Sequence, residues 1–244
     1  MTTPTTPPTT PTTTPPTTPA TSAPSTSRPA SPLSIVVIGA TGMVGRRILD
    51  ESLRRGHRVT AVARRTDALD PRDGLVVHAA NAADSDSLRP ALEGADVVVL
   101  TVRAPAGQEG TLAPLTAGVL EAAALVGARA VIIGGAGALR SPDHPDRLLA
   151  DDPAHVPAQW RALALAGIEQ LEACRARPAQ AWTYVSPSAV LDDGPGTGGY
   201  RRGTDILLTD EQGSSRISAA DLALAVLDEI EEPGRQRHWT AIQA

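Results

Sequence analysis

Residues 34–65 read SIVVIGATGMVGRRILDESLRRGHRVTAVARR, and this stretch decides the fold class of the chain. A run of β-branched residues leads directly into Gly39, Gly42 and Gly45, and a segment whose apolar residues have helical spacing follows. A second β-branched run, RVTAVA, comes next. Strand, glycine turn, helix and strand in this order predict a βαβ unit with parallel strands.

Each glycine of the motif has a physical role. Gly39 permits a tight turn, Gly42 lets backbone amides approach a pyrophosphate, and Gly45 lets the helix pack closely on the strand. The motif continues with Arg46 and Arg47 instead of the Lys-Ser/Thr pair of a P-loop, which argues against ATP and for a dinucleotide. The other residues expected to bind the cofactor in this turn are Thr41, Met43 and Val44.

The end of the second strand indicates which dinucleotide is bound. A carboxylate there would take the ribose hydroxyls of NAD, whereas this strand ends at Arg64 and Arg65. Arginine favours the 2′-phosphate of NADP. Two alternatives stay open: both arginines are solvated surface residues, or Asp67 turns back to the ribose.

The rest of the chain repeats the alternation of strand and helix. Short apolar runs, from SIVVIG to AWTYVSP, are separated by amphipathic stretches, and continuously apolar strands are typical of a parallel sheet covered on both faces. We therefore predict a Rossmann-type doubly wound α/β sheet within a single NAD(P)-binding domain, residues 34–244. The expected helices are 42–55, 85–93, 111–127, 157–176 and 218–231.

Two segments depart from this alternation. Residues 1–33 are nearly all Thr, Pro, Ser and Ala, so they predict a disordered tail with no apolar area to bury. Residues 186–217 are rich in Gly, Pro and charge, and predict an irregular insert with one short hairpin on the substrate side.

Composition narrows the partners. The chain of 244 residues has a net charge of −5 and no lysine, so we expect no nucleic-acid binding and no lysine chemistry. Its single cysteine, Cys174, makes neither a disulfide nor a cysteine metal cluster, and we expect no metal site. No apolar run is long enough to span a bilayer and no export signal is evident, so we expect no membrane partner and a cytoplasmic location.

Four segments resemble one family. IGATGMVG, the ARR after the second strand, VIIGGAGAL and SRISAADLALAVLDEIEEP together resemble the atypical short-chain dehydrogenase/reductases, in particular the NAD(P)H-binding, NmrA-like group that includes biliverdin/flavin-type reductases. The resemblance covers residues 35 to about 242. It implies a Rossmann fold, an NADP (NADPH) cofactor and, most often, a monomer rather than a homodimer.

The resemblance also implies positions for further cofactor contacts. Asn81 and Ala82 would lie at the adenine, and the backbone of Thr101, Val102 and Arg103 would line the nicotinamide ribose and pyrophosphate. Arg103 has three possible roles: it binds the pyrophosphate, it binds an anionic substrate, or it caps the strand end.

The catalytic set of ordinary short-chain dehydrogenases is missing. They use a Ser with a Tyr-x-x-x-Lys helix, whereas this chain has Trp160 near the tyrosine position, Ala164 at the lysine position and GGAGA, which includes Gly135, in place of the serine segment. The candidates for a general acid are His144 and His155, each of which could equally be a surface loop residue.

The sequence also predicts which residues form the wall of a substrate site. Gly135, Trp160 and Ser188, with Ser186 nearby and Tyr200 from the insert, would form a partly aromatic wall suited to a flat molecule, although Trp160 could instead be a packing residue.

Direct hydride transfer without a tyrosine suits substrates that delocalise charge, so the sequence predicts an NADPH-dependent reductase of a small planar carbonyl, quinone or flavin-like molecule. The alternatives are a non-catalytic NADP-sensing protein and a non-redox isomerase, epimerase or cyclase.

Overall fold

The computed structural model describes residues 21–22 and 31–244. Most of the predicted tail, residues 1–33, therefore lies outside the described residues. Two parts of it are described. Thr21–Ser22 form the short strand β1, and Leu33 packs partly buried against the core, its carbonyl accepting a 2.9 Å hydrogen bond from the Arg58 amide. The packed fold thus begins at Leu33, earlier than the sequence predicted.

A nine-stranded sheet forms the centre of the described structure, in the order β1-β9-β11-β7-β6-β5-β2-β3-β4. The seven strands from β11 to β4 run parallel, and β9 is antiparallel to β11. Their bounds are β2 Ser34–Ile38, β3 Arg58–Ala63, β4 Leu75–Ala79, β5 Val97–Leu100, β6 Arg129–Ile133, β7 Trp182–Ser186, β9 Tyr200–Gly203 and β11 His238–Gln243.

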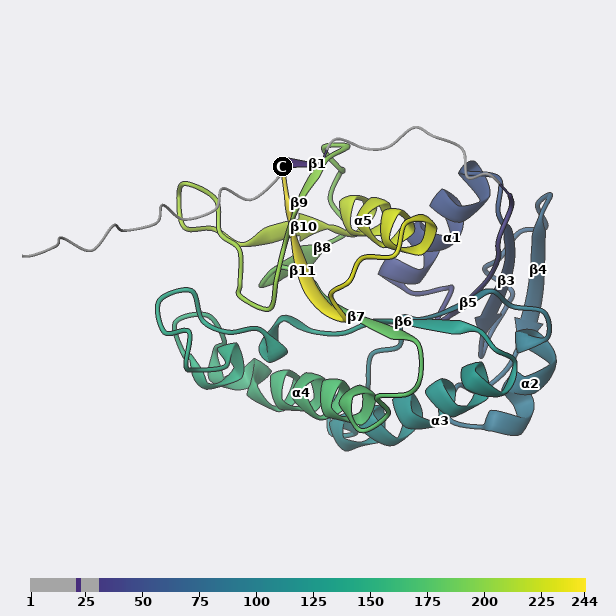
Figure 1. The fold of residues 1–244 in the computed structure, drawn as a ribbon, viewed down its shortest axis with the longest axis horizontal. Helices are drawn as coiled ribbons and strands as arrows, with labels where there is room; N and C mark the ends of the chain where they lie inside the picture. The colour runs from purple at the N-terminus through teal and green to yellow at the C-terminus, as the bar shows by residue number, and fades with distance from the viewer. Residues whose placement is uncertain (1–20, 23–30) are drawn as a thin grey trace, which may run out of the picture.

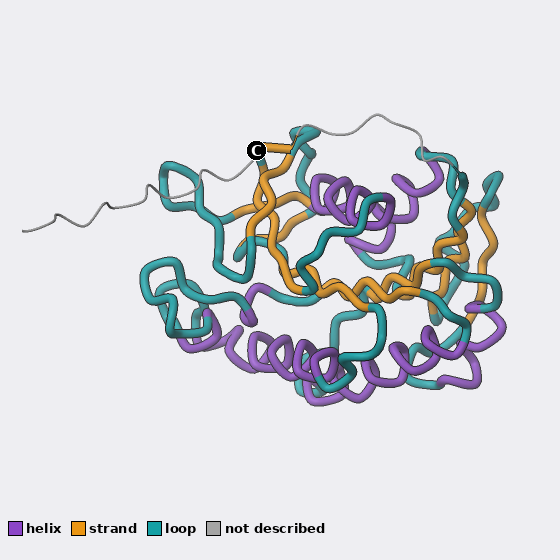
Figure 2. The backbone as a smooth tube through the Cα atoms, in the orientation of Figure 1, coloured by secondary structure: helices purple, strands orange, loops and turns teal. Residues whose placement is uncertain are grey.

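Helices cover both faces of the sheet (Figure 1). On one face α1 (Met43–Arg54) and α5 (Ala219–Glu231) bury one hydrophobic cluster, and on the other α2 (Ser85–Leu92), α3 (Leu112–Leu125) and α4 (Arg161–Arg175) bury a second. Figure 2 shows the same layers, with helices above and below the strands. This confirms the doubly wound Rossmann-type fold. None of the helices in the described part of the chain has the length and apolar character needed to cross a bilayer.

The insert differs from the predicted hairpin. Its strands do not pair with their chain neighbours: β8 (Val190–Asp192) pairs in parallel with β10 (Arg216–Ser218), and β9 joins the main sheet through β11. The sequence pattern did not predict strand β11, because no turn or helix signal sets HWTAIQ apart from the end of the chain. Asp221 of α5 ties the insert down by accepting bonds from the Thr197 and Gly198 amides.

The fourth helix begins later than expected. A 3₁₀ turn occupies Ala158–Trp160, and α4 proper starts at Arg161. The sequence pattern does not separate the two, because the turn and the first helical turn share similar dihedral angles.

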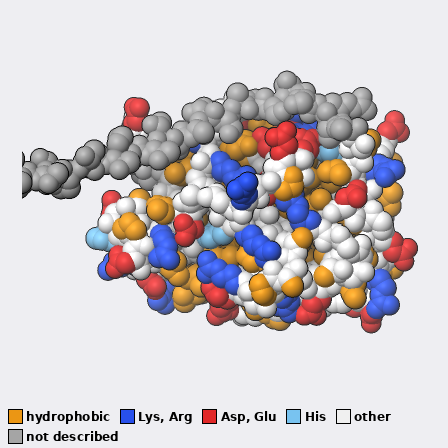
Figure 3. Space-filling model, in the orientation of Figure 1, with side chains coloured by type: hydrophobic (Ala, Val, Ile, Leu, Met, Phe, Trp, Pro, Cys, Tyr) orange, Lys and Arg blue, Asp and Glu red, His pale blue; other side chains and the backbone are white. Residues whose placement is uncertain are grey.

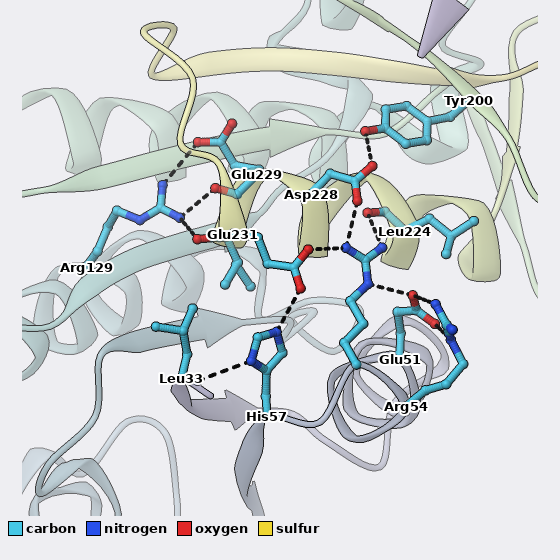
Figure 4. Close-up of polar contacts among 12 residues, drawn as sticks. Leu33, Glu51, Arg54, His57, Arg129, Tyr200, Leu224, Asp228, Glu229 and Glu231 are labelled. Carbon is cyan, nitrogen blue, oxygen red and sulfur yellow. Dashed lines mark hydrogen bonds and ion pairs between the residues drawn. The ribbon is translucent and has the colours of Figure 1, made fainter. Parts of the chain in front are cut away.

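A buried ionic cluster joins α1 to α5 at their carboxyl ends (Figure 4). The Arg55 guanidinium, whose side chain is 6% exposed, donates to Glu51, Asp228 and Glu231 at 2.6–2.7 Å. Burial alone would raise the pKa of Glu51, but hydrogen bonds from Arg54 and Arg55 lower it below its usual range. These bonds keep the carboxylate charged. One arginine therefore pairs with carboxylates from two helices.

Replacing Arg55 should test this cluster. Arg55→Met removes the main buried cation and leaves three carboxylates close to one another. We therefore expect a loss of about 3–5 kcal/mol in the free energy of unfolding, measured by urea titration. The matched control is Arg54→Ala, because Arg54 also contacts Glu51 but its side chain is 66% exposed. We expect that control to cost less than about 1 kcal/mol. Equal losses for the two variants would contradict a central role for Arg55.

Candidate functional site

The glycine turn is held by contacts that leave no room for side chains. Gly39 has φ +88°, a conformation that other residues rarely adopt, and its amide donates to the Val62 carbonyl at 2.9 Å. A Cβ on Gly45 would run into the Gly39 carbonyl and lie 2.8 Å from Thr101 Oγ1. That hydroxyl donates to the Ile38 and Gly39 carbonyls at 3.0 and 3.2 Å. Because these glycines have no side chains, α1, β2 and the end of β5 come into direct contact.

The start of α1 is open to a ligand. Gly42 caps the helix without a side-chain hydrogen bond, and the first turn carries no acidic residue. The amides of the first turn have no partner within the helix, and the helix dipole adds partial positive charge. The geometry is therefore a phosphate cradle of the kind that the sequence predicted.

A cleft of about 1030 Å³ opens over the carboxyl ends of the parallel strands. Its walls come from the glycine turn, from the segments after β3, β5 and β6, and from one face of α4 and the chain after β7. Of the predicted site residues, those that line it are Gly39, Thr41, Gly42, Met43, Val44, Arg64, Asn81, Ala82, Thr101, Val102, Arg103, Gly135, His155, Trp160 and Ser188.

The cleft is positively charged although the chain is acidic. Its lining includes Arg64 and Arg103 and contains no Asp or Glu, whereas the whole chain has 27 carboxylate residues. On the face drawn in Figure 3, by contrast, arginine and carboxylate side chains are interspersed among the described residues. The charged residues at the cleft therefore favour an anionic ligand.

The two arginines after β3 differ in position. Arg64 lines the cleft, while Arg65 and Asp67 are exposed and do not line it. Within the described residues neither arginine forms an ion pair. Arg64 is thus placed to meet a ligand, and Arg65 is not.

Asn81 is used locally. Its side-chain oxygen accepts from the Ala83 amide at 3.2 Å, so the side-chain NH₂ is the group left to contact a base.

Arg103 and Trp160 meet at the rim of the cleft. The Arg103 guanidinium lies 5.5 Å from the centre of the Trp160 ring, which is 50% exposed. The contact brings a residue predicted at the cofactor together with one predicted at the substrate. The exposed ring does not act as a core packing residue.

Close packing leaves no room for a long side chain at the lysine position. Ala164, at the lysine position, is buried, and a Cβ on Gly137 would lie 2.7 Å from it. The 3₁₀ turn Ala136–Ala138 therefore rests directly on the backbone of α4. A long side chain at position 164 would displace that turn.

Besides Arg65, three predicted residues lie differently from what the sequence suggested. Tyr200 is buried and donates to Asp228 at 2.7 Å, on the α5 side of the sheet, so it does not face the cleft. His144 is exposed on its loop and is not part of the cleft lining. Ser188 lines the cleft, but its hydroxyl donates to the Ala241 carbonyl at 2.9 Å. Gly45 does not line the cleft, but it has the close-packing role that the motif predicted.

His155 remains at the cleft. In the part of the chain that the structure describes, its buried Nε2 has no hydrogen-bond partner and lies 4.0 Å from Asp143 Oδ2. Its backbone amide donates to the Asp152 carbonyl at 3.1 Å. A hydrogen bond from Ser141 holds the pKa of Asp152 below its usual range despite burial.

Sequence reasoning missed other polar groups near the cleft. Gln170 lines it from α4 and donates to Thr116 of α3 at 3.1 Å. Only helical spacing from Trp160 and Gly167 could have placed Gln170 on the cleft face.

Comparison with known proteins agrees with this geometry. A family model described as NAD(P)H-binding matches residues 39–233. The chain belongs to this NAD(P)H-binding family. The resemblance indicated by the four sequence segments is thereby confirmed, and so is the binding of a nicotinamide dinucleotide in its general form.

Relatives of this NAD(P)H-binding protein cover nearly the whole fold. The uncharacterised Bacillus subtilis protein YwnB is 33% identical over 206 residues, which is 82% of this chain and 93% of YwnB. A candidate epimerase from Bacteroides thetaiotaomicron has a TM-score of 0.79 and 30% identity, covering 87% of this chain and 98% of its own. A candidate NADH-flavin reductase from Streptococcus pneumoniae has a TM-score of 0.74 and 28% identity, covering 87% and 100%.

The glycine packing makes a direct prediction for this NAD(P)H-binding protein. Gly45→Ala places a methyl group against the Gly39 carbonyl, so we expect the turn to shift and NADPH affinity to fall at least about tenfold, measured by fluorescence titration. Gly110→Ala is the control, because a Cβ there meets nothing within 4 Å. Wild-type affinity in Gly45→Ala would show that the contact does not shape the cradle.

Proposed function

We propose that this protein is an NADPH-dependent reductase that passes a hydride to a small planar carbonyl, quinone or flavin-like molecule. The observation that carries the proposal is the charge of the cleft: arginines and no carboxylates line it, in a chain of net charge −5. Of the two nicotinamide dinucleotides, the one with a 2′-phosphate carries the more negative charge and so suits this lining better. Reduced nicotinamide would supply the hydride.

The choice of NADPH rests on Arg64. It follows β3, where the fold places the adenosine ribose, and its guanidinium is exposed within the cleft. A guanidinium can donate two parallel hydrogen bonds to a phosphate. We assign the 2′-phosphate to Arg64 and leave Arg65 outside the site.

The far end of the cleft suits a flat, mainly apolar substrate. Trp160, Leu163 and Val156 line it beside the Gly135 backbone. Flat conjugated acceptors spread the developing charge, which reduces the need for the missing tyrosine. The candidate flavin reductase among the structural relatives is in keeping with this substrate class.

We assign proton delivery to His155 where the acceptor requires it. It is the histidine among the described residues that line the cleft. An imidazole can donate a proton near neutral pH. Acceptors that delocalise charge can instead take the proton from solvent.

A second candidate is an NADP-sensing protein without catalysis. The packing of Gly137 against Ala164 favours it, because that contact leaves no room for a lysine at the position where ordinary short-chain dehydrogenases carry theirs. An epimerase or other non-redox activity is a third candidate, in line with the Bacteroides relative. We further propose a cytoplasmic monomer that acts on a small molecule.

Cofactor preference should depend on Arg64. We expect wild type to bind NADPH at least about tenfold more tightly than NADH, and Arg64→Ala to lose most of that difference while NADH affinity stays the same. Arg65→Ala is the control and should keep the preference, because Arg65 lies outside the cleft. Equal affinities in wild type would remove the 2′-phosphate role of Arg64.

Turnover should be measured as the loss of NADPH absorbance with a panel of quinones, flavins, enones and diketones. We expect steady oxidation with at least one member. Binding without turnover across the panel would favour the sensor, and product formation without net oxidation would favour an isomerase or epimerase.

His155 should matter most for acceptors that need a proton. We expect His155→Asn to lower kcat about a hundredfold with a carbonyl acceptor and much less with a flavin. His144→Asn is the matched control on the same loop region, because His144 is exposed outside the cleft. If both variants keep wild-type kcat with carbonyls, His155 is not the proton donor.

A further inference from the structure

A polar pair, a buried serine and a partly buried histidine, lies behind the cleft wall, in strands that the proposed reaction does not otherwise use. The Ser186 hydroxyl, at the end of β7, donates to the Gly135 carbonyl at 3.0 Å. His238 Nε2, at the start of β11, lies 3.0 Å from the Ser186 hydroxyl oxygen. Because the serine proton is committed to Gly135, the serine oxygen accepts from His238 Nε2–H. The chain of bonds therefore runs from His238 through Ser186 to Gly135.

The histidine is held neutral in this arrangement. Its Nδ1 is buried and has no hydrogen-bond partner among the described residues, and burial lowers the pKa of His238 to about 4. A neutral ring with the proton on Nε2 is the form that can donate to Ser186. The unpaired Nδ1 is a cost, since a buried acceptor without a partner destabilises the fold. An apolar side chain would fill the same place without that cost.

The neighbouring tyrosine packs against Gly134, the residue before Gly135. Tyr184 lies two residues before Ser186 on the same face of β7, and its ring meets the His238 ring edge-on at 5.4 Å. Its hydroxyl donates to the Gly167 carbonyl at 2.8 Å. Gly134 has no Cβ where the tyrosine ring lies against it, and its amide donates to Val185 at 2.9 Å.

Gly135 is the point at which this pair reaches the cleft. It lines the wall beside Ala136 and Gly137, at the segment that replaces the serine segment of ordinary short-chain dehydrogenases. The next residues form the 3₁₀ turn that rests on α4. A shift of the Gly135 carbonyl would therefore move the wall against which a substrate lies.

We propose that Ser186 and His238 are positioning residues, which hold the Gly135 carbonyl and so fix the substrate wall of the cleft. This inference rests on the proposed reductase function for its kinetic consequence. Neither side chain lines the cleft, so neither touches the substrate. The unpaired nitrogen indicates that His238 serves to hold this segment in place and not stability alone.

Four variants test the pair. Ser186→Ala and His238→Phe remove the bonds, whereas Ser186→Thr keeps the hydroxyl and His238→Gln keeps an N–H donor near the Nε2 position. Thr183→Val is the matched control: Thr183 lies on the opposite face of β7 and loses a hydroxyl bond of 3.1 Å to Glu229. Two readouts are measured, hydrogen–deuterium exchange over residues 134–140 and steady-state kinetics with an accepted substrate.

We expect faster exchange over residues 134–140 in Ser186→Ala and His238→Phe, with KM for the acceptor raised about tenfold and NADPH affinity within twofold of wild type. Ser186→Thr, His238→Gln and Thr183→Val should keep wild-type exchange and KM.

The proposal is overturned if Ser186→Ala and His238→Phe exchange like wild type, if His238→Gln behaves like His238→Phe, or if exchange rises while KM stays unchanged. Should wild type turn over no acceptor, the reductase function fails. The exchange comparison then decides by itself whether the pair holds the wall.

Discussion

The contact on which the rest of the structure depends is the one between the glycine turn and Thr101. Gly39 and Gly45 approach each other and the Thr101 hydroxyl so closely that a methyl group on either glycine would collide with them. This contact fixes the start of α1 over the ends of β2 and β5. The open amides of that helix, the cleft and the position of Arg64 all follow from it.

A second backbone contact limits the chemistry. Gly137 rests on Ala164 of α4, in the part of the cleft where ordinary short-chain dehydrogenases carry their tyrosine and lysine. The absence of the lysine is therefore built into the packing, whereas the tyrosine position is held by the half-exposed Trp160. The groups that remain at this end are the Gly135 backbone, Trp160, Arg103 and His155. For the proposed reductase we assign to them the binding and orientation of a flat substrate, and to His155 the delivery of a proton.

Charge is divided between the two ends of the molecule. Carboxylates from α1 and α5 gather around Arg55, where Figure 4 shows them converging on one guanidinium, while the lining of the cleft has none. The first arrangement stabilises the fold because the cation is buried with its partners. The second leaves a field suited to an anionic dinucleotide. Stability and binding thus rely on separate groups of charged residues.

The sequence by itself determined the Rossmann-type sheet, the glycine cradle and Arg64 at the cleft, because strand periodicity, glycine spacing and the residue ending a strand are local properties. Only the tertiary structure decided which polar side chains face the cleft. Tyr200 turned toward Asp228, Ser188 toward Ala241, and the pair of Ser186 and His238 formed between strands 52 residues apart. A side chain's direction depends on the partner that satisfies its buried polar atoms, and that partner comes from distant parts of the chain.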